Sequence, residues 1–352
     1  MTSLLQSTIE RIGPLDREMM AQARARQDTL TKPRGSLGRL EDLSVQVAGI
    51  TGQLIPPMDH KAVLVMAGDH GVAREGVSAY PAEVTPQMVL NFLRGGAAIN
   101  VLARQVGARV VVVDVGVAFD FEPSPGLLNY KVAHGTQNLA AGPAMTREQA
   151  IQSIEAGIRA VQHEMAHGLH LVATGDMGIG NTTPSSAITA AITGRPVAAV
   201  TGRGTGLSDE QLAAKVGVIE RALAVNRPDP ADPLDVLSKV GGFEIGGIAG
   251  VILGAAAHRL PVIIDGFISG AGALIAAGLC PRAADYMIAA HNSVEVGHRA
   301  ILSHLAVEPI FDLNMRLGEG TGAALAMNVV EAAVRILKEM ATFASAGVSD
   351  RA

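Results

Sequence analysis

The 352-residue sequence has one cysteine, Cys280, and no tryptophan, and only 3% of its residues are aromatic. A single cysteine excludes an internal disulfide and fits a reducing cytoplasm, where we expect the protein to reside. The formal charge of −5 argues against a nucleic-acid binder, because such proteins usually carry a basic face or basic runs. Mean hydropathy is +0.30. The longest apolar run, residues 245–257, is nevertheless shorter than the roughly 18 residues that a bilayer requires, so we expect no membrane partner.

Glycine, in contrast, is abundant, with 40 residues. These glycines cluster just after short apolar runs, where they permit turns with positive φ and let the backbone approach a ligand closely. With 48% hydrophobic and 17% charged residues, the chain is too apolar to be disordered. The composition therefore predicts a globular, ligand-binding α/β enzyme.

Short apolar, β-branched runs recur along the chain, and each ends in a polar corner that usually contains glycine. These runs occupy residues 62–67, 109–113, 171–174, 197–201, 261–264 and 287–290. Runs that are apolar on both faces are typical of buried parallel strands. Helical segments with capping boxes at Thr146–Gln149 and Ser208–Gln211 lie between them. This alternation predicts a doubly wound sheet, with ligands bound beyond the carboxyl ends of the strands.

The two ends of the chain have a different pattern. Residues 3–24, 38–53 and 321–343 are predicted to be helical, and no strand is evident before residue 60 or after residue 293. We therefore expect both termini to pack together as a small helical appendage. The segment Arg227–Pro233, with three prolines, is predicted to be a surface loop.

Two glycine-rich loops are candidates for nucleotide binding. The first, GDMGIGNTT at residues 175–183, follows a predicted strand and precedes the helical run 185–193, so its N–H groups suit a phosphate or ribose. It could equally be a turn that binds nothing. The second, residues 201–210, matches neither a dinucleotide nor a Walker motif. Lys215 follows it and could supply a charge to a phosphate, or simply be a solvated surface lysine.

Three further segments carry side chains of interest. His291, Glu295 and His298 are spaced to share one helix face, which could hold a metal, a cap or a ligand wall, although no zinc-enzyme spacing is met. Tyr80, in the long loop 68–85, could stack on a planar ligand or pack that loop. Glu319 lies between two glycines before an apolar helix, where it could approach a substrate or simply favour the helix dipole.

Several strings together resemble one known family. They are TKPRGSLGRLE (31–41), AGDHGV (67–72), EGVSAYPAEVT (75–85), GDMGIGNTT, TGRGTGL (201–207) and RLGEGTGAALA (316–326). The sequence resembles the nicotinate-nucleotide–dimethylbenzimidazole phosphoribosyltransferases. The motifs occur in order, and the resemblance extends from about residue 8 to about residue 340. The reaction follows from this resemblance and not from composition or spacing.

The resemblance implies a three-layer α/β/α fold with a mostly parallel, Rossmann-like sheet and a small helical domain. The helical domain would comprise residues 1–40 plus 318–352, and residues 41–317 would form the large domain. The family transfers the phosphoribosyl group of nicotinate mononucleotide to a base such as 5,6-dimethylbenzimidazole. The products are α-ribazole 5′-phosphate, for the nucleotide loop of cobalamin, and nicotinate. A homodimer is implied, with no cofactor and no protein-bound metal.

The resemblance also implies roles for individual residues. Glu319 would be the general base that removes the ring proton of the incoming base. The pocket for that base would comprise Tyr80, Met88, Met177 and Leu317. The nucleotide and its phosphate would be held by Asp176, Gly178, Gly180, Asn181, Gly204, Lys215, Gly266 and Ser293. Asp176 stands where many members have glutamate; it remains a carboxylate but is one methylene shorter.

Two other classes of protein compete with this interpretation. A catalytically silent nucleotide-binding relative would have no reason to retain Glu319 together with Lys215. An NAD-dependent dehydrogenase would carry a G-x-G-x-x-G fingerprint after a strand, and none follows any predicted strand.

Overall fold

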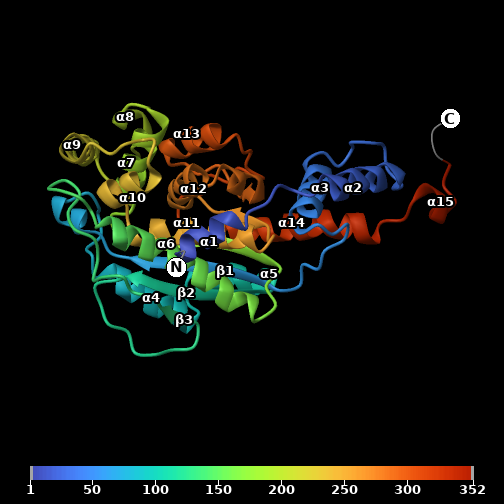
Figure 1. Ribbon diagram of the computed structural model, residues 1–352, viewed down its shortest axis with the longest axis horizontal. Coiled ribbons are helices and arrows are strands. Elements are labelled where there is room, and N and C mark those ends of the chain that lie inside the picture. The colour runs from blue at the N-terminus through green and yellow to red at the C-terminus, as the bar shows by residue number, and fades with distance from the viewer. Residues whose placement is uncertain (1–2, 350–352) are drawn as a thin grey trace.

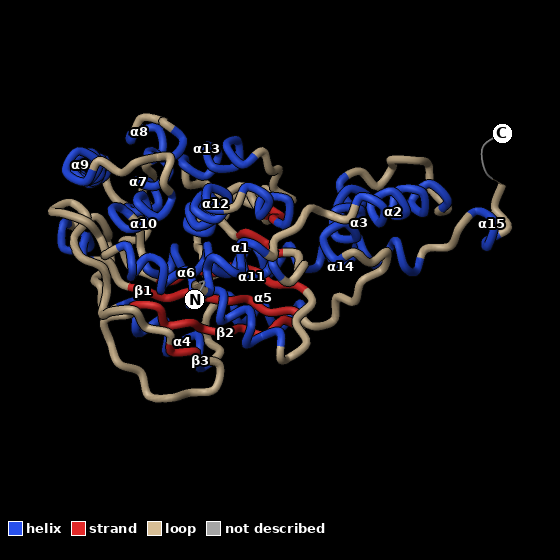
Figure 2. The backbone as a smooth tube through the Cα atoms, viewed as in Figure 1, coloured by secondary structure: helices blue, strands red, loops and turns tan. Residues whose placement is uncertain are grey.

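The computed structural model describes residues 3–349 and contains a six-stranded sheet with the order β3-β2-β1-β4-β5-β6. The strands are β1 (Lys61–Gly68), β2 (Ala108–Gly116), β3 (Leu127–Asn129), β4 (Leu171–Met177), β5 (Val262–Ile264) and β6 (Met287–Ala289). All neighbouring strands pair in parallel (Figure 2). The predicted doubly wound sheet is confirmed, and five of its strands match the apolar runs identified in the sequence.

Helices cover both faces of this sheet. One face packs against α6 (Arg147–Met165), α11 (Phe243–Ala257) and α12 (Phe267–Leu279). The other face packs against α4 (Val84–Arg94), α5 (Ala98–Val106) and α14 (Thr321–Glu339). Each interface encloses its own buried apolar cluster. The three-layer α/β/α architecture is therefore confirmed.

A further group of helices covers α12. It comprises α7 (Thr182–Thr193), α8 (Val197–Val200), α9 (Asp209–Asn226), α10 (Pro233–Val240) and α13 (Val296–Leu305). Helices α7 and α13 pack directly on α12, and α9 packs on α7 (Figure 1). Both predicted capping boxes are present, at Thr146 before α6 and at Ser208 before α9. This group of helices lies beside the carboxyl edge of the sheet, where it forms one wall of the candidate site.

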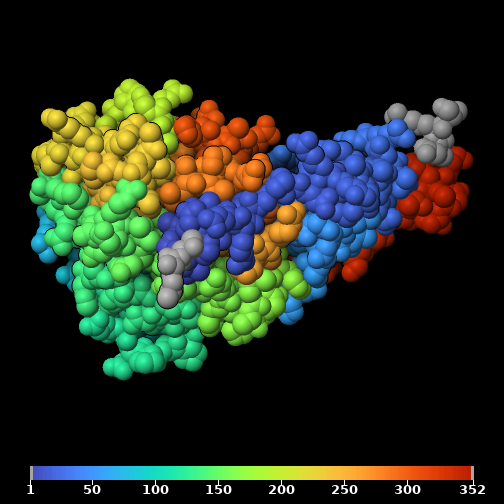
Figure 3. All heavy atoms as spheres, viewed as in Figure 1, coloured from blue at the N-terminus to red at the C-terminus, as the bar shows by residue number. Residues whose placement is uncertain are grey.

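Segments from both ends of the chain form an arm that projects from the α/β body. Helices α2 (Arg17–Thr29) and α3 (Arg39–Thr51) pack with the outer half of α14, and α15 (Phe343–Ala346) follows (Figures 1 and 3). A small apolar cluster that includes Val45 and Leu337 holds the arm together. Helix α1 (Leu4–Glu10) packs instead on α6 and α11. The boundaries at residues 40 and 318 stay a prediction, and residues 1–2 and 350–352 lie outside the described part of the chain.

Four sequence predictions were wrong in detail. Residues 197–201 form the short helix α8 instead of a strand, because Pro196 caps a helical turn and β4 pairs directly with β5. The short edge strand β3 was not predicted. The expected helix 3–24 is two helices separated by a loop that contains Gly13 and Pro14. His291, Glu295 and His298 share no helix face, because α13 begins only at Val296.

Within residues 3–349, no helix combines the length and apolar character that a membrane crossing needs.

Candidate active site

The candidate site lies where the strand order reverses between β1 and β4. From this point the chain builds the sheet outward in both directions, and in doubly wound sheets ligands bind in the crevice at such a position. A cavity of about 300 Å³ opens there, lined by the segments that follow β4, β5 and β6. The predicted location beyond the carboxyl ends of the strands is therefore where the structure forms a cavity.

The cavity brings together most of the residues singled out in the sequence. Those lining it are Tyr80, Asp176, Gly178, Gly180, Asn181, Gly204, Gly266, Ser293 and Leu317. Glu319, Met88, Met177 and Lys215 are not among the lining residues. Lys215 and Glu319 are both buried: Lys215 lies behind Gly204, which lines the cavity, and Glu319 follows the lining residue Gly318 in the chain.

The glycines of the cavity wall are required by close packing. A methyl group at Gly178 would collide with the carbonyl oxygen of Gly68, and one at Gly204 would lie 2.9 Å from Thr182 Oγ1. Gly204 also has a φ of +51°, a conformation that favours glycine. Helix α7 begins at Thr182, which lines the same cavity. The wall therefore presents bare backbone and a helix N-terminus, an arrangement suited to an anion.

Lys215 lies immediately behind this wall. It projects from α9, is almost fully buried, and its Nζ donates to Thr182 Oγ1 at 2.6 Å. Its Nζ would lie 3.3 Å from a methyl group at Gly204, so only a glycine backbone separates the ammonium from the cavity. Burial lowers the pKa of Lys215 to about 8, against the opposing effect of the Glu295 carboxylate.

Two charged residues of this wall lie outside the nucleotide site that the resemblance implies, although the sequence offered Glu295 as a cap or ligand-wall residue. Arg316 lines the cavity and donates from Nη1 to the Gly204 carbonyl oxygen at 2.8 Å. Glu295 lines it from the N-cap position of α13, and burial raises the pKa of its carboxyl, although Lys215 and Arg316 oppose this. Arg316 lies within the RLGEGTG string, but nothing in the sequence indicated that it would reach the loop at Gly204.

Buried carboxylates lie at and behind another part of the cavity lining. Asp176, at the end of β4, is held by a hydrogen bond from Asn181 Nδ2 at 2.9 Å, yet burial and the nearby Asp265 raise its pKa well above the usual value. Burial also raises the pKa of Asp265 to about 7. Asp265 accepts hydrogen bonds from the N–H groups of Gly320 at 3.2 Å and Ala323 at 2.8 Å. It therefore fixes the N-terminus of α14, directly after Glu319.

Glu319 has an unusual backbone. Its φ is +62°, between Gly318 at +83° and Gly320 at +88°. The side chain is buried, and burial raises the pKa of its carboxyl while the N–H of Ile99 at the start of α5 opposes that rise. Oε2 has no hydrogen-bond partner within the described residues. A buried carboxylate with a raised pKa and an unused oxygen is equipped to accept a proton from a substrate.

The four predicted base-pocket residues fall into two pairs. Tyr80 and Leu317 line the cavity and are 56% and 57% exposed. Met88 on α4 and Met177 at the end of β4 are half-buried and pack against the apolar cluster on the α14 side of the sheet. Tyr80 also lines a second, wider cavity of about 550 Å³. Of the four predicted residues, only Tyr80 and Leu317 therefore line the cavity.

Comparison with known proteins gives one consistent result. A family described as "Phosphoribosyltransferase" matches residues 12–348. The nicotinate-nucleotide–dimethylbenzimidazole phosphoribosyltransferase of Desulforudis audaxviator is 64% identical over 98% of both chains, and that of Geobacter sulfurreducens is 62% identical over 99% of both. A crystal structure of the Thermus thermophilus enzyme superposes with a TM-score of 0.91 at 50% identity, covering 96% of this chain and 100% of that one.

The fold and the site define a nucleotide-binding α/β enzyme with an anion wall and a carboxylate wall. The match to known phosphoribosyltransferases over nearly the whole chain identifies the family within this class. The chain belongs to the nicotinate-nucleotide–dimethylbenzimidazole phosphoribosyltransferase family.

Proposed function

We propose that the protein transfers the 5-phosphoribosyl group of nicotinate mononucleotide to 5,6-dimethylbenzimidazole or a related lower-ligand base. The products are α-ribazole 5′-phosphate, for the nucleotide loop of cobalamin, and nicotinate. The observation that carries the proposal is one cavity with a wall of glycine backbone backed by Lys215, beside which the buried carboxyl group of Glu319 has a raised pKa. The glycine wall suits the phosphate of the donor, and Glu319 suits proton removal from the acceptor.

The donor nucleotide binds along the glycine wall. Its phosphate is held by backbone at Gly178, Gly204 and Gly266, by the Ser293 hydroxyl and by the ammonium of Lys215. Gly180, Asn181 and Asp176 complete the nucleotide site. This assignment rests on the cavity lining, on the 2.6 Å bond that holds Lys215 against Thr182, and on the affinity of helix N-termini for phosphate.

Glu319 acts as the general base. One ring nitrogen of the benzimidazole attacks C1′ of the ribose, and the N–H of the other must then lose its proton or the product would be cationic. A carboxylate within hydrogen-bond reach takes that proton. Nicotinate leaves from a pyridinium and is neutral at its ring nitrogen, so it needs no general acid, and one carboxylate suffices where glycosidases use two. Inversion at C1′ converts the β-linkage of the donor into the α-linkage of the product.

The flat base lies among Tyr80, Leu317, Met88 and Met177. A tyrosine ring offers a stacking surface, and two methionines adapt to different outlines. Such a slot suits benzimidazoles and also admits purines or simple phenols, so a range of bases is part of the proposal.

A homodimer is also part of the proposal. It is supported by exposed apolar side chains beside the cavity mouth, on two segments that run together: Val294, Val296, Leu313 and Leu317. Light scattering at increasing protein concentration tests it, and a mass equal to one chain throughout would contradict it.

The experiment that tests the reaction is chromatographic. Purified protein is incubated with nicotinate mononucleotide plus dimethylbenzimidazole, adenine or phenol, and both free nicotinate and a new ribotide are measured. We expect nicotinate release only when a base is present. A folded protein that binds the nucleotide but releases no nicotinate with any base would overturn the proposal and favour a silent relative.

A further inference from the structure

The segment HEMAHGLH, residues 163–170, holds three of the ten histidines of the chain. His163 lies in the last turn of α6, and His167 lies in the turn that leads to β4. This turn precedes the amino end of β4, whereas the candidate active site lies beyond its carboxyl end. The proposed transferase reaction uses none of these histidines.

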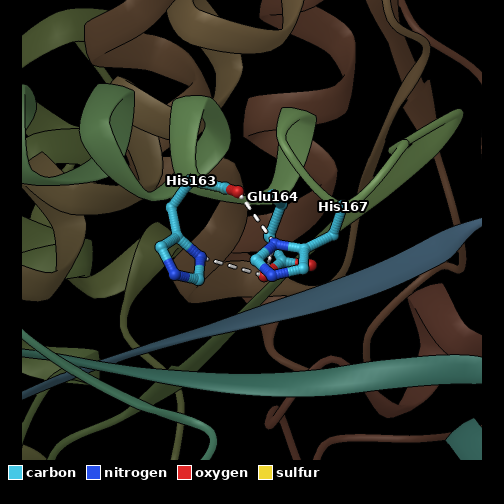
Figure 4. Close-up of side chains that lie close together, drawn as sticks. All are labelled: His163, Glu164 and His167. Atoms are coloured by element: carbon cyan, nitrogen blue, oxygen red, sulfur yellow. Dashed lines mark hydrogen bonds and ion pairs between the residues drawn. The ribbon is translucent and has the colours of Figure 1, made fainter.

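The side chains of His163, Glu164 and His167 converge (Figure 4). Glu164 Oε1 is 3.2 Å from His163 Nδ1 and 3.9 Å from His167 Nδ1. One ligand-type atom from each residue can be chosen so that all three lie within 4.8 Å of one another. Tetrahedral zinc with bonds of about 2.1 Å places its ligand atoms roughly 3.4 Å apart. His167 Nδ1 donates to the His163 carbonyl oxygen at 3.0 Å, which leaves Nε2 as the free nitrogen of that ring. A three-ligand site therefore needs rotation of the two exposed rings, with Nε2 of His167 as its ligand atom.

Glu164 is already oriented for such a role. Its side chain is only 4% exposed, and Arg109 donates to Oε2 from Nε at 3.0 Å and from Nη2 at 2.7 Å. This fork fixes the carboxylate and leaves Oε1 directed at the histidines. Metal-binding carboxylates are commonly held by such a second partner, which fixes the ligand before the ion arrives.

The histidines supply access for an ion. The side chains of His163 and His167 are 41% and 55% exposed, so an ion can enter and water can complete its coordination. An alternative is that both histidines merely pair as cations with Glu164. Arg109 already balances the charge of that carboxylate, so two further cations would create a surplus, whereas two neutral imidazoles would not. Imidazole ligands select zinc, nickel, cobalt or copper over magnesium or calcium.

We propose that His163, Glu164 and His167 form a binding site for a divalent transition-metal ion of the zinc class. The bound ion joins the end of α6 to the turn that leads into β4. Because the ion binds the folded chain, it also raises the unfolding temperature.

The test uses the untagged full-length protein and ZnCl2 in a titration calorimeter, with thermal unfolding measured in parallel. We expect one ion per chain, with an affinity that falls at least tenfold in the double variant H163Q/H167Q and a zinc-dependent rise in unfolding temperature that the variant loses. Without metal, the variant should unfold at the wild-type temperature, because both side chains are largely exposed.

Two control variants, H60Q/H170Q and H304Q, replace histidines outside the proposed metal site. The neighbouring pair His60 and His170 has ring centroids 5.0 Å apart, but within the described residues it belongs to no convergent group of three metal-ligand side chains. The variant H60Q/H170Q should therefore bind zinc like the wild type, as should H304Q on an exposed helix end. No binding by the wild type, binding unchanged in H163Q/H167Q, or binding lost only in H60Q/H170Q would each overturn the proposal.

Discussion

The two walls of the cavity show how one physical cause has opposite results. Burial raises the pKa of Asp176, Asp265 and Glu319, and it lowers the pKa of Lys215 to about 8. Desolvation disfavours whichever form carries a charge, so acids and bases both move toward neutrality. A carboxylate whose pKa is raised holds a proton more strongly, which favours proton transfer from the incoming base to Glu319. Lys215 loses its proton at a lower pH than a solvated lysine does, and the Glu295 carboxylate opposes this lowering of its pKa.

We expect the largest effect when the carboxylate of the proposed general base, Glu319, is removed. In Glu319→Gln we expect turnover to fall by about 10²–10⁴, the range typical of a lost general base, with both Michaelis constants changed only a few-fold. Steady-state kinetics with both substrates measures this. Asp176→Asn is the comparison variant, because Asp176 is a buried carboxylate that lines the cavity, and its place in the proposed nucleotide site predicts a higher KM for the nucleotide with turnover little changed. Near-normal turnover in Glu319→Gln and a large loss in Asp176→Asn would transfer the role to Asp176.

Removing the charge of the other wall should act on binding. In Lys215→Ala we expect the KM for nicotinate mononucleotide to rise about 10–100-fold, since a hydrogen bond to a charged group contributes about 1.5–3 kcal/mol. The KM for the base should hardly change. An effect confined to the base would contradict the division into two walls. Thr182→Val, which removes only the hydroxyl that Lys215 contacts at 2.6 Å, is the companion variant and should have a smaller effect.

The pH dependence of the KM for the nucleotide tests the role of the Lys215 charge. Because the pKa of Lys215 is lowered to about 8, its ammonium is fully present below that pH and is lost above it. The KM for the nucleotide should therefore rise roughly tenfold per pH unit above about pH 8. In Glu295→Gln the supporting charge is gone, so the rise should begin at lower pH, while Arg316 and Thr182 remain in place. A profile unchanged by Glu295→Gln would show that the two residues are not coupled.

The smallest expected effect is at the mouth of the site. Tyr80→Ala should raise the KM for dimethylbenzimidazole several-fold, consistent with about 0.5–1.5 kcal/mol for an aromatic pair, and leave the KM for the nucleotide unchanged. Tyr80→Phe keeps the ring and should behave like the wild type. If both variants lose activity with every base, Tyr80 holds the loop 68–85 in place and does not stack on the base.

The sequence predicted the sheet well because buried parallel strands need apolar residues on both faces, and that pattern is local. It failed at residues 197–201, where the valines suit either a strand or a helix and only the direct pairing of β4 with β5 excludes a strand. Arg316 was missed as a wall residue for a similar reason. Its contact with the Gly204 carbonyl joins segments 112 residues apart, and no local pattern encodes such a distance.

The consecutive positive φ angles at Gly318, Glu319 and Gly320 have an implication for selection experiments. A left-handed conformation costs a residue with a side chain about 1–2 kcal/mol, and this site adds the burial of a carboxyl group with a raised pKa. Glu319→Gly should therefore unfold at a higher temperature than the wild type and yet be inactive. A library screened only for heat resistance would enrich glycine at position 319, whereas one screened for nicotinate release would retain glutamate. The residue found at position 319 would then show whether the library had been selected for heat resistance or for activity.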